Sequence, residues 1–201
     1  MPQSLFNQIL DETLKLPLTT TQERKEEIYS YIFGLATPDH RKTERVLITE
    51  DNVATNIYFL LRGTCRFFFY SKSRKQDLIP FLQLSPCILA EGKSLRKNLS
   101  ARFNISVNAH SIVYILSKAA LNTIELKNPE VGIGIDQLIK QQTHEFKLWK
   151  KKLNSQTPER RYLKFKLRKP EVEKYSLKKD IAGHLGIKDT SYSRMVKRLS
   201  K

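Results

Sequence analysis

The last part of the chain, residues 176–200, constrains its fold more than any other stretch. Its apolar spacing predicts two short helices joined by a tight turn, the first over residues 177–185 and the second from about residue 189. Gly186 follows the first helix where a helix end favours a left-handed glycine. Asp189 is a good N-cap for the second helix, whose expected inward residues are Tyr192, Met195, Val196 and Leu199.

The outer face of the second helix is basic and rich in hydroxyl groups, because it carries Thr190, Ser191, Arg194, Lys197 and Arg198. A helix with one buried stripe and one exposed basic stripe can enter the major groove of duplex DNA. The pattern is that of a helix-turn-helix and predicts DNA binding. An ordinary helical hairpin with a solvated basic face is the alternative that the pattern leaves open.

The charge distribution favours a nucleic-acid partner. The chain has 36 basic and 20 acidic residues, a net charge of +16. Residues 147–201 hold 18 of the basic and five of the acidic residues, a net charge of +13, so the excess coincides with the helix-turn-helix. Such a field attracts a polyphosphate and speeds its encounter with the protein. A membrane surface is the weaker reading, because it requires an unburied apolar face, and here the apolar positions are needed for a small core.

Composition argues against several other classes of protein. The longest apolar runs, residues 57–61 and 112–116, are too short to span a membrane, and the N-terminus does not have the pattern of a secretory signal. Cys65 and Cys87 are expected to be buried thiols in a reducing cytoplasm. No metal or other cofactor is expected, since the histidines show no paired spacing; they are His40, His110, His144 and His184.

The middle of the chain predicts a small antiparallel barrel or jelly roll. Residues 1–35 are expected to be helical, and residues 85–100 to form a polar segment with no clear strand. Short runs rich in Val, Ile, Phe and Tyr indicate strands at residues 44–49, 56–61, 64–70, 76–82, 103–107 and 111–116.

Helices are expected again after these strands, over residues 117–126, 130–154 and 159–168. The long middle helix has a narrow apolar stripe, which often pairs with its symmetry mate. The alternative is that the stripe packs on the chain's own barrel. The stripe consists of Ile135, Leu138, Ile139, Phe146, Trp149 and Leu153.

In this order the elements resemble the bacterial Crp/Fnr family of transcription regulators. Residues 56–63, followed by Cys65 and Arg66, resemble a roll strand that ends in a glycine turn. Residues 102–117 resemble the last two roll strands, residues 157–165 resemble the first helix of the DNA-binding domain in one branch, and the closing helix-turn-helix resembles the family's own.

The resemblance implies an α+β fold in three parts. These are an effector-sensing, cyclic-nucleotide-binding-like β-roll with N-terminal helices (1–128), a dimerisation helix (129–154) and a helix-turn-helix domain (155–201). It implies a homodimer that reads a palindromic site on double-stranded DNA, and it leaves RNA polymerase open as a further partner. The family's base and phosphate contacts fall on Lys188, Asp189, Thr190 and Arg194.

Arg194 is the residue expected to make a bidentate contact with guanine. Ser191 belongs to the same outer face, and Asp189 alternatively serves only as a helix cap. Lys178, Lys179 and Lys197 are expected to contact phosphates, which sets position without reading sequence.

Departures from the family concern its nucleotide site. Nucleotide-binding members carry a Gly-Glu pair and an arginine followed by small residues. Here Glu91 and Arg102 match the acid and the arginine, but Ala90 replaces the glycine, and Phe103 and Asn104 replace the small residues. We therefore expect a roll that is degenerate for cyclic AMP and senses another ligand or none, with Glu91 and Arg102 in a solvated loop and at a strand edge. A cyclic-nucleotide-responsive regulator that uses both residues is the alternative.

Other functions have weaker support. No phosphate loop, HExxH motif or Ser/His/Asp set indicates an enzyme, so no catalytic residue is expected. The iron–sulfur branch of the family needs four cysteines, and this chain has two. A non-regulatory nucleic-acid-binding protein, or an effector module whose basic tail binds RNA or a protein, remains open.

Overall fold

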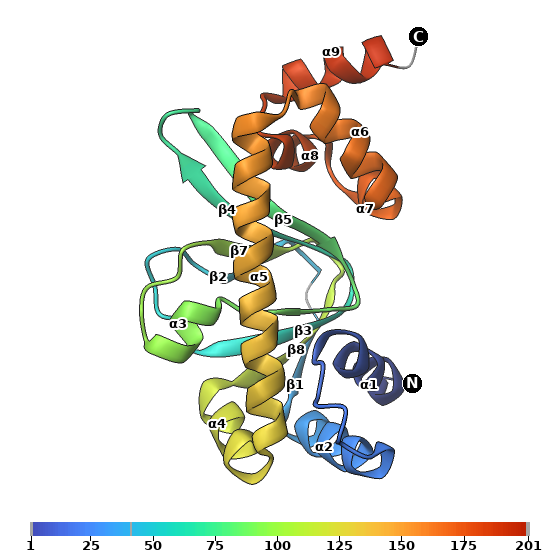
Figure 1. Ribbon diagram of the computed structural model, residues 1–201, viewed down its shortest axis with the longest axis vertical. Helices are drawn as coiled ribbons and strands as arrows, with labels where there is room; N and C mark the ends of the chain where they lie inside the picture. The colour runs from blue at the N-terminus through green and yellow to red at the C-terminus, as the bar shows by residue number, and fades with distance from the viewer. Residues whose placement is uncertain (1, 41, 200–201) are drawn as a thin grey trace.

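The computed structural model describes residues 2–40 and 42–199 and has the expected α+β architecture. Two N-terminal helices lie at one end of a β-roll, a long helix runs along the roll, and shorter helices gather at the far end (Figure 1). In the part of the chain described, no helix has the length and hydrophobicity needed to cross a membrane. The helices are α1 (Pro2–Thr13), α2 (Gln22–Leu35), α3 (Gly92–Lys97), α4 (Lys118–Lys127), α5 (Pro129–Ser155), α6 (Pro158–Arg168), α7 (Pro170–Tyr175), α8 (Lys178–Leu185) and α9 (Asp189–Leu199).

The roll consists of two antiparallel sheets that share a core, in which Leu60, Leu89 and Ile105 are fully buried. One sheet has the strand order β1 (Thr37–His40), β8 (Ile112–Ser117), β3 (Asn56–Arg62) and β6 (Cys87–Leu89). The other has the order β2 (Arg45–Ile48), β7 (Asn104–Val107), β4 (Thr64–Ser71) and β5 (Gln76–Leu84).

All six expected strands are present, but the expectation for residues 85–100 is wrong. That segment contains β6, which pairs with β3, and the helix α3. Strand β1, which pairs with β8, was not expected either. Both missed strands are short and begin beside a proline, Pro38 or Pro86, which masks the local pattern of a strand.

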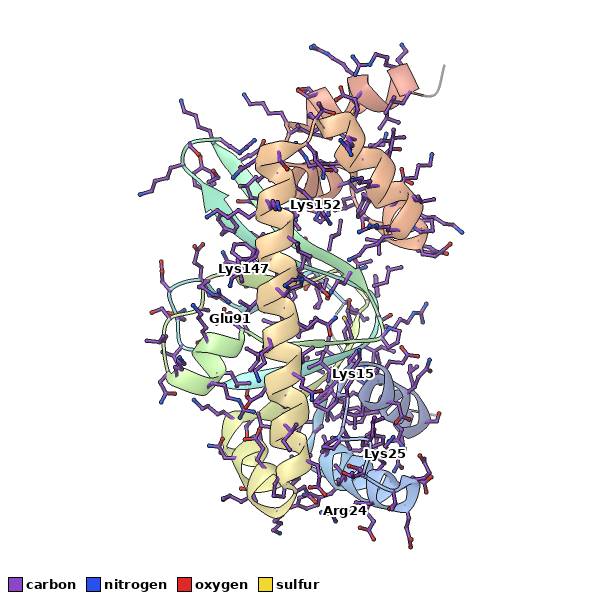
Figure 2. The ribbon with its side chains drawn as sticks, viewed as in Figure 1. Lys15, Arg24, Lys25, Glu91, Lys147 and Lys152 are labelled. Atoms are coloured by element: carbon purple, nitrogen blue, oxygen red, sulfur yellow. The ribbon has the colours of Figure 1, made fainter. Side chains whose placement is uncertain are left out.

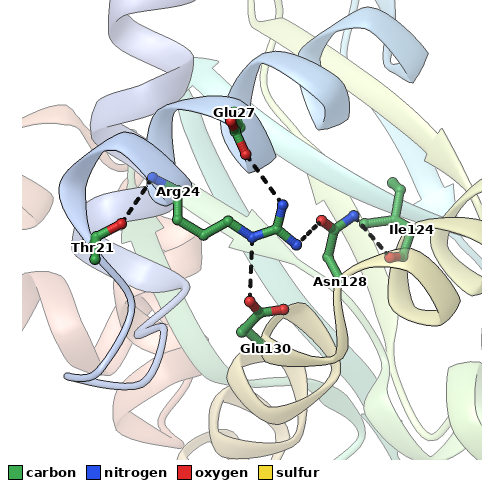
Figure 3. A network of polar contacts seen from close by, with 6 residues as sticks. All are labelled: Thr21, Arg24, Glu27, Ile124, Asn128 and Glu130. Atoms are coloured by element: carbon green, nitrogen blue, oxygen red, sulfur yellow. Dashed lines mark hydrogen bonds and ion pairs between the residues drawn. The ribbon is translucent and has the colours of Figure 1, made fainter.

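A polar network fastens α2 to the start of the long helix (Figure 3). Arg24 donates from Nη2 to Oδ1 of Asn128 at 2.7 Å and from Nε to Oε1 of Glu130 at 3.4 Å. Its third partner is Glu27, one turn further along α2, and Thr21 caps the same helix. Because Asn128 is buried between α4 and α5, this network sets where α5 leaves the N-terminal end.

The apolar stripe of α5 packs on its own roll. A Cβ atom at Gly92 would lie 2.4 Å from Cγ1 of Ile139, so α3 and α5 meet at these two residues. Further along, the ring of Phe146 lies 5.2 Å from that of Phe103, and the two rings meet edge to face. Trp149 is buried in a cluster with Leu78 of β5, and it also donates from Nε1 to the carbonyl of His184 on α8 at 2.9 Å. Ile139, Phe146 and Trp149 therefore pack on the chain's own barrel, which was the alternative to pairing with a symmetry mate.

The C-terminal helices pack on strand β5. A Cβ atom at Gly183 of α8 would lie 2.9 Å from Cδ1 of Ile79 and 3.1 Å from the carbonyl oxygen of Asp77. Only a glycine permits this approach of helix to strand. Ile79 and Leu82 of β5 then complete a core with Tyr162, Phe165, Val172, Ile181, Ala182, Leu185, Tyr192 and Met195.

Candidate nucleic-acid interface

The expected helix-turn-helix is present as α8, a turn at Gly186, and α9, and the structure describes it as far as Leu199. Gly186 has a φ of +68°, the left-handed conformation that favours glycine at a helix end. The amide of Ile187 then donates to the carbonyl of Ala182 at 3.0 Å, which closes the last turn of α8. The sequence pattern therefore located the turn correctly.

The inner face of α9 holds the helix on its domain. Tyr192 and Met195 are each 5 % exposed, and the ring of Tyr192 lies 5.8 Å from that of Tyr162 on α6. The expectation that Leu199 faces inward is wrong, because it is 41 % exposed where the helix runs out at its C-terminal end. Asp189 is the first residue of α9 rather than the residue before it.

The outer face of α9 is open to solvent, at the end of the molecule away from α1 and α4 (Figure 1). Arg198 on this helix forms an ion pair with Glu159 of α6, whereas Arg194 and Lys197 form no ion pair with any described residue. The free cations on α9 are thus available to an outside partner. All the residues expected to contact DNA are exposed; they are Lys178, Lys179, Lys188, Asp189, Thr190, Ser191, Arg194 and Lys197.

Charged side chains of the roll hold α8 in place, and sequence reasoning missed them. Arg66 of β4 forms ion pairs with Asp180 at 2.5 Å and with Glu44 at 2.6 Å. Arg74, in the turn between β4 and β5, donates to the carbonyl of Gly186 at 3.0 Å. Both arginines lie in or beside strands. Their partners in and just after α8 come about a hundred residues later, so only the folded structure reveals these contacts.

His184 of α8 lies between β5 and α6. Its Nδ1 lies 2.8 Å from the carbonyl of Ile79, and its ring centroid lies 5.1 Å from that of Phe165. Burial lowers the pKa of His184 to about 4, and the positive charges of Lys169, Lys152 and Arg161 act in the same direction. The imidazole is therefore neutral at pH 7, and Nδ1 carries the proton that it donates to Ile79.

Solved structures share this arrangement of roll, long helix and helix-turn-helix. FixK2 from Bradyrhizobium japonicum is similar over 82 % of this chain and 84 % of its own, with a TM-score of 0.69 and 16 % identity. CLP from Xanthomonas campestris, described as a c-di-GMP-responsive global regulator, is similar over 87 % and 91 %, with a TM-score of 0.70 and 11 % identity. A Crp/Fnr-family regulator from Eubacterium rectale is similar over 87 % and 82 %, with a TM-score of 0.66 and 14 % identity.

The chain has the Crp/Fnr fold. No protein-family model matches the sequence, and no curated protein matches it. At such low identities the likeness confirms the expected fold, a cyclic-nucleotide-binding-like roll followed by helices. A fold alone does not determine an activity.

The two residues that matched the Crp/Fnr nucleotide site are paired with each other. Arg102 donates from Nε to Oε1 of Glu91 at 2.7 Å, and the other oxygen of Glu91 accepts from the amide of Ser94 at 2.8 Å, which caps α3. Glu91 is only 2 % exposed, beside α3 (Figure 2). The expectation of a solvated loop is therefore wrong for Glu91, whose buried charge is compensated within the chain.

Aromatic side chains fill the space beside Glu91 and Arg102. The cavity beside Glu91 and Arg102 has a volume of about 10 Å³, which admits roughly one water molecule. The ring of Phe103 lies 6.3 Å from that of Phe81 and 5.2 Å from that of Phe146 on the long helix. The bulky residue that replaces a small one thus closes the roll from inside.

The two cysteines lie together in the roll, as buried thiols. The sulfur atoms of Cys65 and Cys87 are 3.9 Å apart. Contact with Cys87 and burial raise the pKa of the Cys65 thiol well above its ordinary value, so this thiol is unreactive at neutral pH. Among residues 2–40 and 42–199, no cluster of side chains is suited to hold a metal ion.

Proposed function

We propose that this protein is a DNA-binding transcription regulator of the Crp/Fnr type, rather than an enzyme. The observation that carries the proposal is α9, whose apolar face is buried on its domain while its basic face is open to solvent. A helix held in this way can enter a major groove without unfolding anything. The similarity to solved Crp/Fnr regulators supports the same function.

In this proposal some side chains of the helix-turn-helix contact bases and others contact phosphates. Arg194 reads guanine through O6 and N7, since the guanidinium is free of any ion pair with a described residue. Lys188 and Thr190, at the start of α9, reach base edges or phosphates. The phosphate contacts that set the position of the protein come from Lys178, Lys179 and Lys197.

The test is a selection of duplexes from a random pool, followed by affinity measurements with variants. Arg194→Ala is expected to cost about 1–3 kcal/mol on the selected site and much less on random DNA. Arg62→Ala, an exposed arginine of the roll with no ion pair to a described residue, serves as the control and is expected to leave both affinities unchanged. Equal losses on both kinds of DNA would show that Arg194 touches only phosphate.

We also propose that the protein is a homodimer through the helix at residues 129–154. With most of the original stripe packed on the roll, the large apolar residues of α5 that remain exposed are Ile133 and Leu148, 48 % and 41 % exposed. A two-fold axis beside α5 would place half-sites about 34–36 Å apart on DNA. Light scattering that gives a monomer at high micromolar concentration, with a single half-site bound, would rule the dimer out.

The roll, residues 1–128 with its N-terminal helices, is proposed to be degenerate for cyclic AMP. A buried cyclic phosphate needs full compensation, and here Arg102 is already paired with Glu91. Calorimetric titration with cyclic AMP and cyclic GMP is expected to show no saturable binding. Micromolar binding that is lost in Arg102→Ala would restore the alternative in which Glu91 and Arg102 hold a nucleotide.

The remaining parts of the proposal are a helix-turn-helix domain over residues 155–201, a cytoplasmic location, and RNA polymerase as a partner at promoters. A non-regulatory nucleic-acid-binding protein, or one whose basic tail binds RNA, is distinguished by competition. Selected duplex should displace single-stranded RNA at equal nucleotide concentration, and the reverse result would favour the RNA reading.

A further inference from the structure

A second cavity lies outside the roll, between the C-terminal half of α5, strand β5 and α6. Its volume is about 380 Å³, and it reaches the end of α8. Lys152 of α5 lies at the level of the C-terminal helices (Figure 2). The volume is at the lower end of the range of small-molecule sites, roughly 300–1,000 Å³. It is far too small to admit a DNA duplex.

Five basic residues line this cleft, against a single acidic residue. Three of them, Lys152, Lys164 and Arg168, form no ion pair with any residue that the structure describes. Their charges repel one another across the cleft, so an anion placed between them is attracted by all three. The basic residues are Lys152, Arg161, Lys164, Arg168 and Lys169, and the acidic residue is Glu145.

The other two basic residues donate to carbonyl groups, which are neutral acceptors. Arg161 donates to the carbonyl of Leu185 at 2.7 Å and to that of Leu153 at 3.2 Å. Lys169 has the carbonyl of Leu82 at 3.5 Å. Burial lowers the pKa of both Arg161 and Lys169, although Glu159 acts in the opposite direction on Arg161 and Glu145 on Lys169. A bound anion would further stabilise both charged forms.

Aromatic side chains also line the cleft. Trp149 and Phe165 contribute aromatic surface beside the cations. Ligand sites combine apolar surface with a few placed polar or charged groups. Several cations beside aromatic side chains together suit a small phosphorylated metabolite.

We propose that this cleft binds a small phosphorylated metabolite, with its phosphate between Lys164 and Arg168 of α6 and Lys152 of α5. Arginine and lysine are the side chains that bind phosphate most strongly in proteins. The site is distinct from the filled cavity at Glu91 and Arg102. Its walls come from the roll side and from the C-terminal helices, so a bound ligand links α6 to α5 and β5. This binding does not depend on the proposed function.

Trp149 is the chain's only tryptophan, so its fluorescence reports on the cleft. The full chain is titrated with AMP, inorganic pyrophosphate and adenosine at fixed ionic strength. AMP and pyrophosphate are expected to change the emission in a saturable way, with one site per chain. Adenosine, which lacks the phosphate, is expected to bind at least tenfold more weakly.

Two double variants with the same loss of charge locate the site. Lys164→Gln with Arg168→Gln is expected to raise the Kd for AMP at least tenfold. The control, Lys150→Gln with Lys151→Gln, removes two exposed lysines of α5 that do not line the cleft, and it is expected to change the Kd less than twofold. If the first variant does not fold by circular dichroism, Lys152→Gln alone decides, with a rise of at least threefold.

Several results would overturn the proposal. They are the absence of saturable binding by both phosphate compounds, equal losses in the cleft variant and the control, or adenosine binding as tightly as AMP. A change in Trp149 emission on adding duplex DNA, with none on adding AMP or pyrophosphate, would overturn it too, because neither phosphate compound would then bind in the cleft. None of these outcomes depends on whether α9 reads a specific site.

Discussion

Acid should destabilise the packing of the helix-turn-helix on the roll through His184. The folded protein binds a proton at this residue only below about pH 4, whereas the unfolded chain binds it below about pH 6.5. Between these values the unfolded state holds more protons, so the free energy of unfolding falls as the pH falls. The two-state relation with these pKa values gives a loss of about 2 kcal/mol between pH 7 and pH 5.

The measurement is urea unfolding at pH 7, 6 and 5 for the wild type and for His184→Asn. Asparagine retains an N–H group that can donate to the carbonyl of Ile79, and it does not titrate. Between pH 7 and pH 5 the free energy of unfolding is expected to fall by about 2 kcal/mol more for the wild type than for the variant. Other titrating groups contribute equally to both proteins, so they do not affect this difference. His144→Asn, which changes an exposed histidine of α5, is expected to follow the wild type.

Parallel pH profiles for the wild type and His184→Asn would refute this reasoning. They would mean that His184 is protonated as easily in the folded protein as in the unfolded chain. The contacts with Ile79 and Phe165 would then have to open at pH 5 at little cost.

Three further perturbations test other parts of the structure. Phe103→Ala should cost about 3–5 kcal/mol of stability in a thermal or urea melt, because it empties an aromatic cluster. Gly183→Ala should cost about 1–3 kcal/mol of stability, because the added Cβ would press on β5. Gly34→Ala is the control: an added Cβ there would meet no other described part of the chain within 4 Å, so the change should be neutral or stabilising. Replacing Lys178 and Lys179 together by Gln should reduce the slope of log affinity against log salt by about 2, and equally on specific and random DNA; an unchanged slope would show that they do not touch phosphate.

Local signals in the sequence were sufficient for the helices with caps and for the turn. Thr157 and Pro158 predict the start of α6, and the side chain of Thr157 does accept from the amide of Arg160. Gly186 predicts the end of α8 for the same kind of reason. These features depend on residues a few positions apart, which a sequence displays directly.

Features that depend on distant residues could not be predicted. Helix α3 was missed because its N-cap is Glu91, whose side chain looked like a nucleotide ligand or a solvated charge. The long helix shows an apolar stripe, but only the fold reveals that Phe146 lies against Phe103 rather than against a second chain. Likewise, nothing local tells that Arg66 faces Asp180, 114 residues later.

The core shared by β5 and the C-terminal helices affects how substitutions in this protein should be interpreted. Ile79 and Leu82 leave the ribosome about a hundred residues before α8, so a folded roll offers a finished surface on which the last helices can dock. A substitution in β5 would then weaken the proposed DNA binding by melting α8 and α9, although β5 lies outside the helix-turn-helix. Only amide hydrogen exchange in these two helices would distinguish such a variant from one that has lost a contact to DNA.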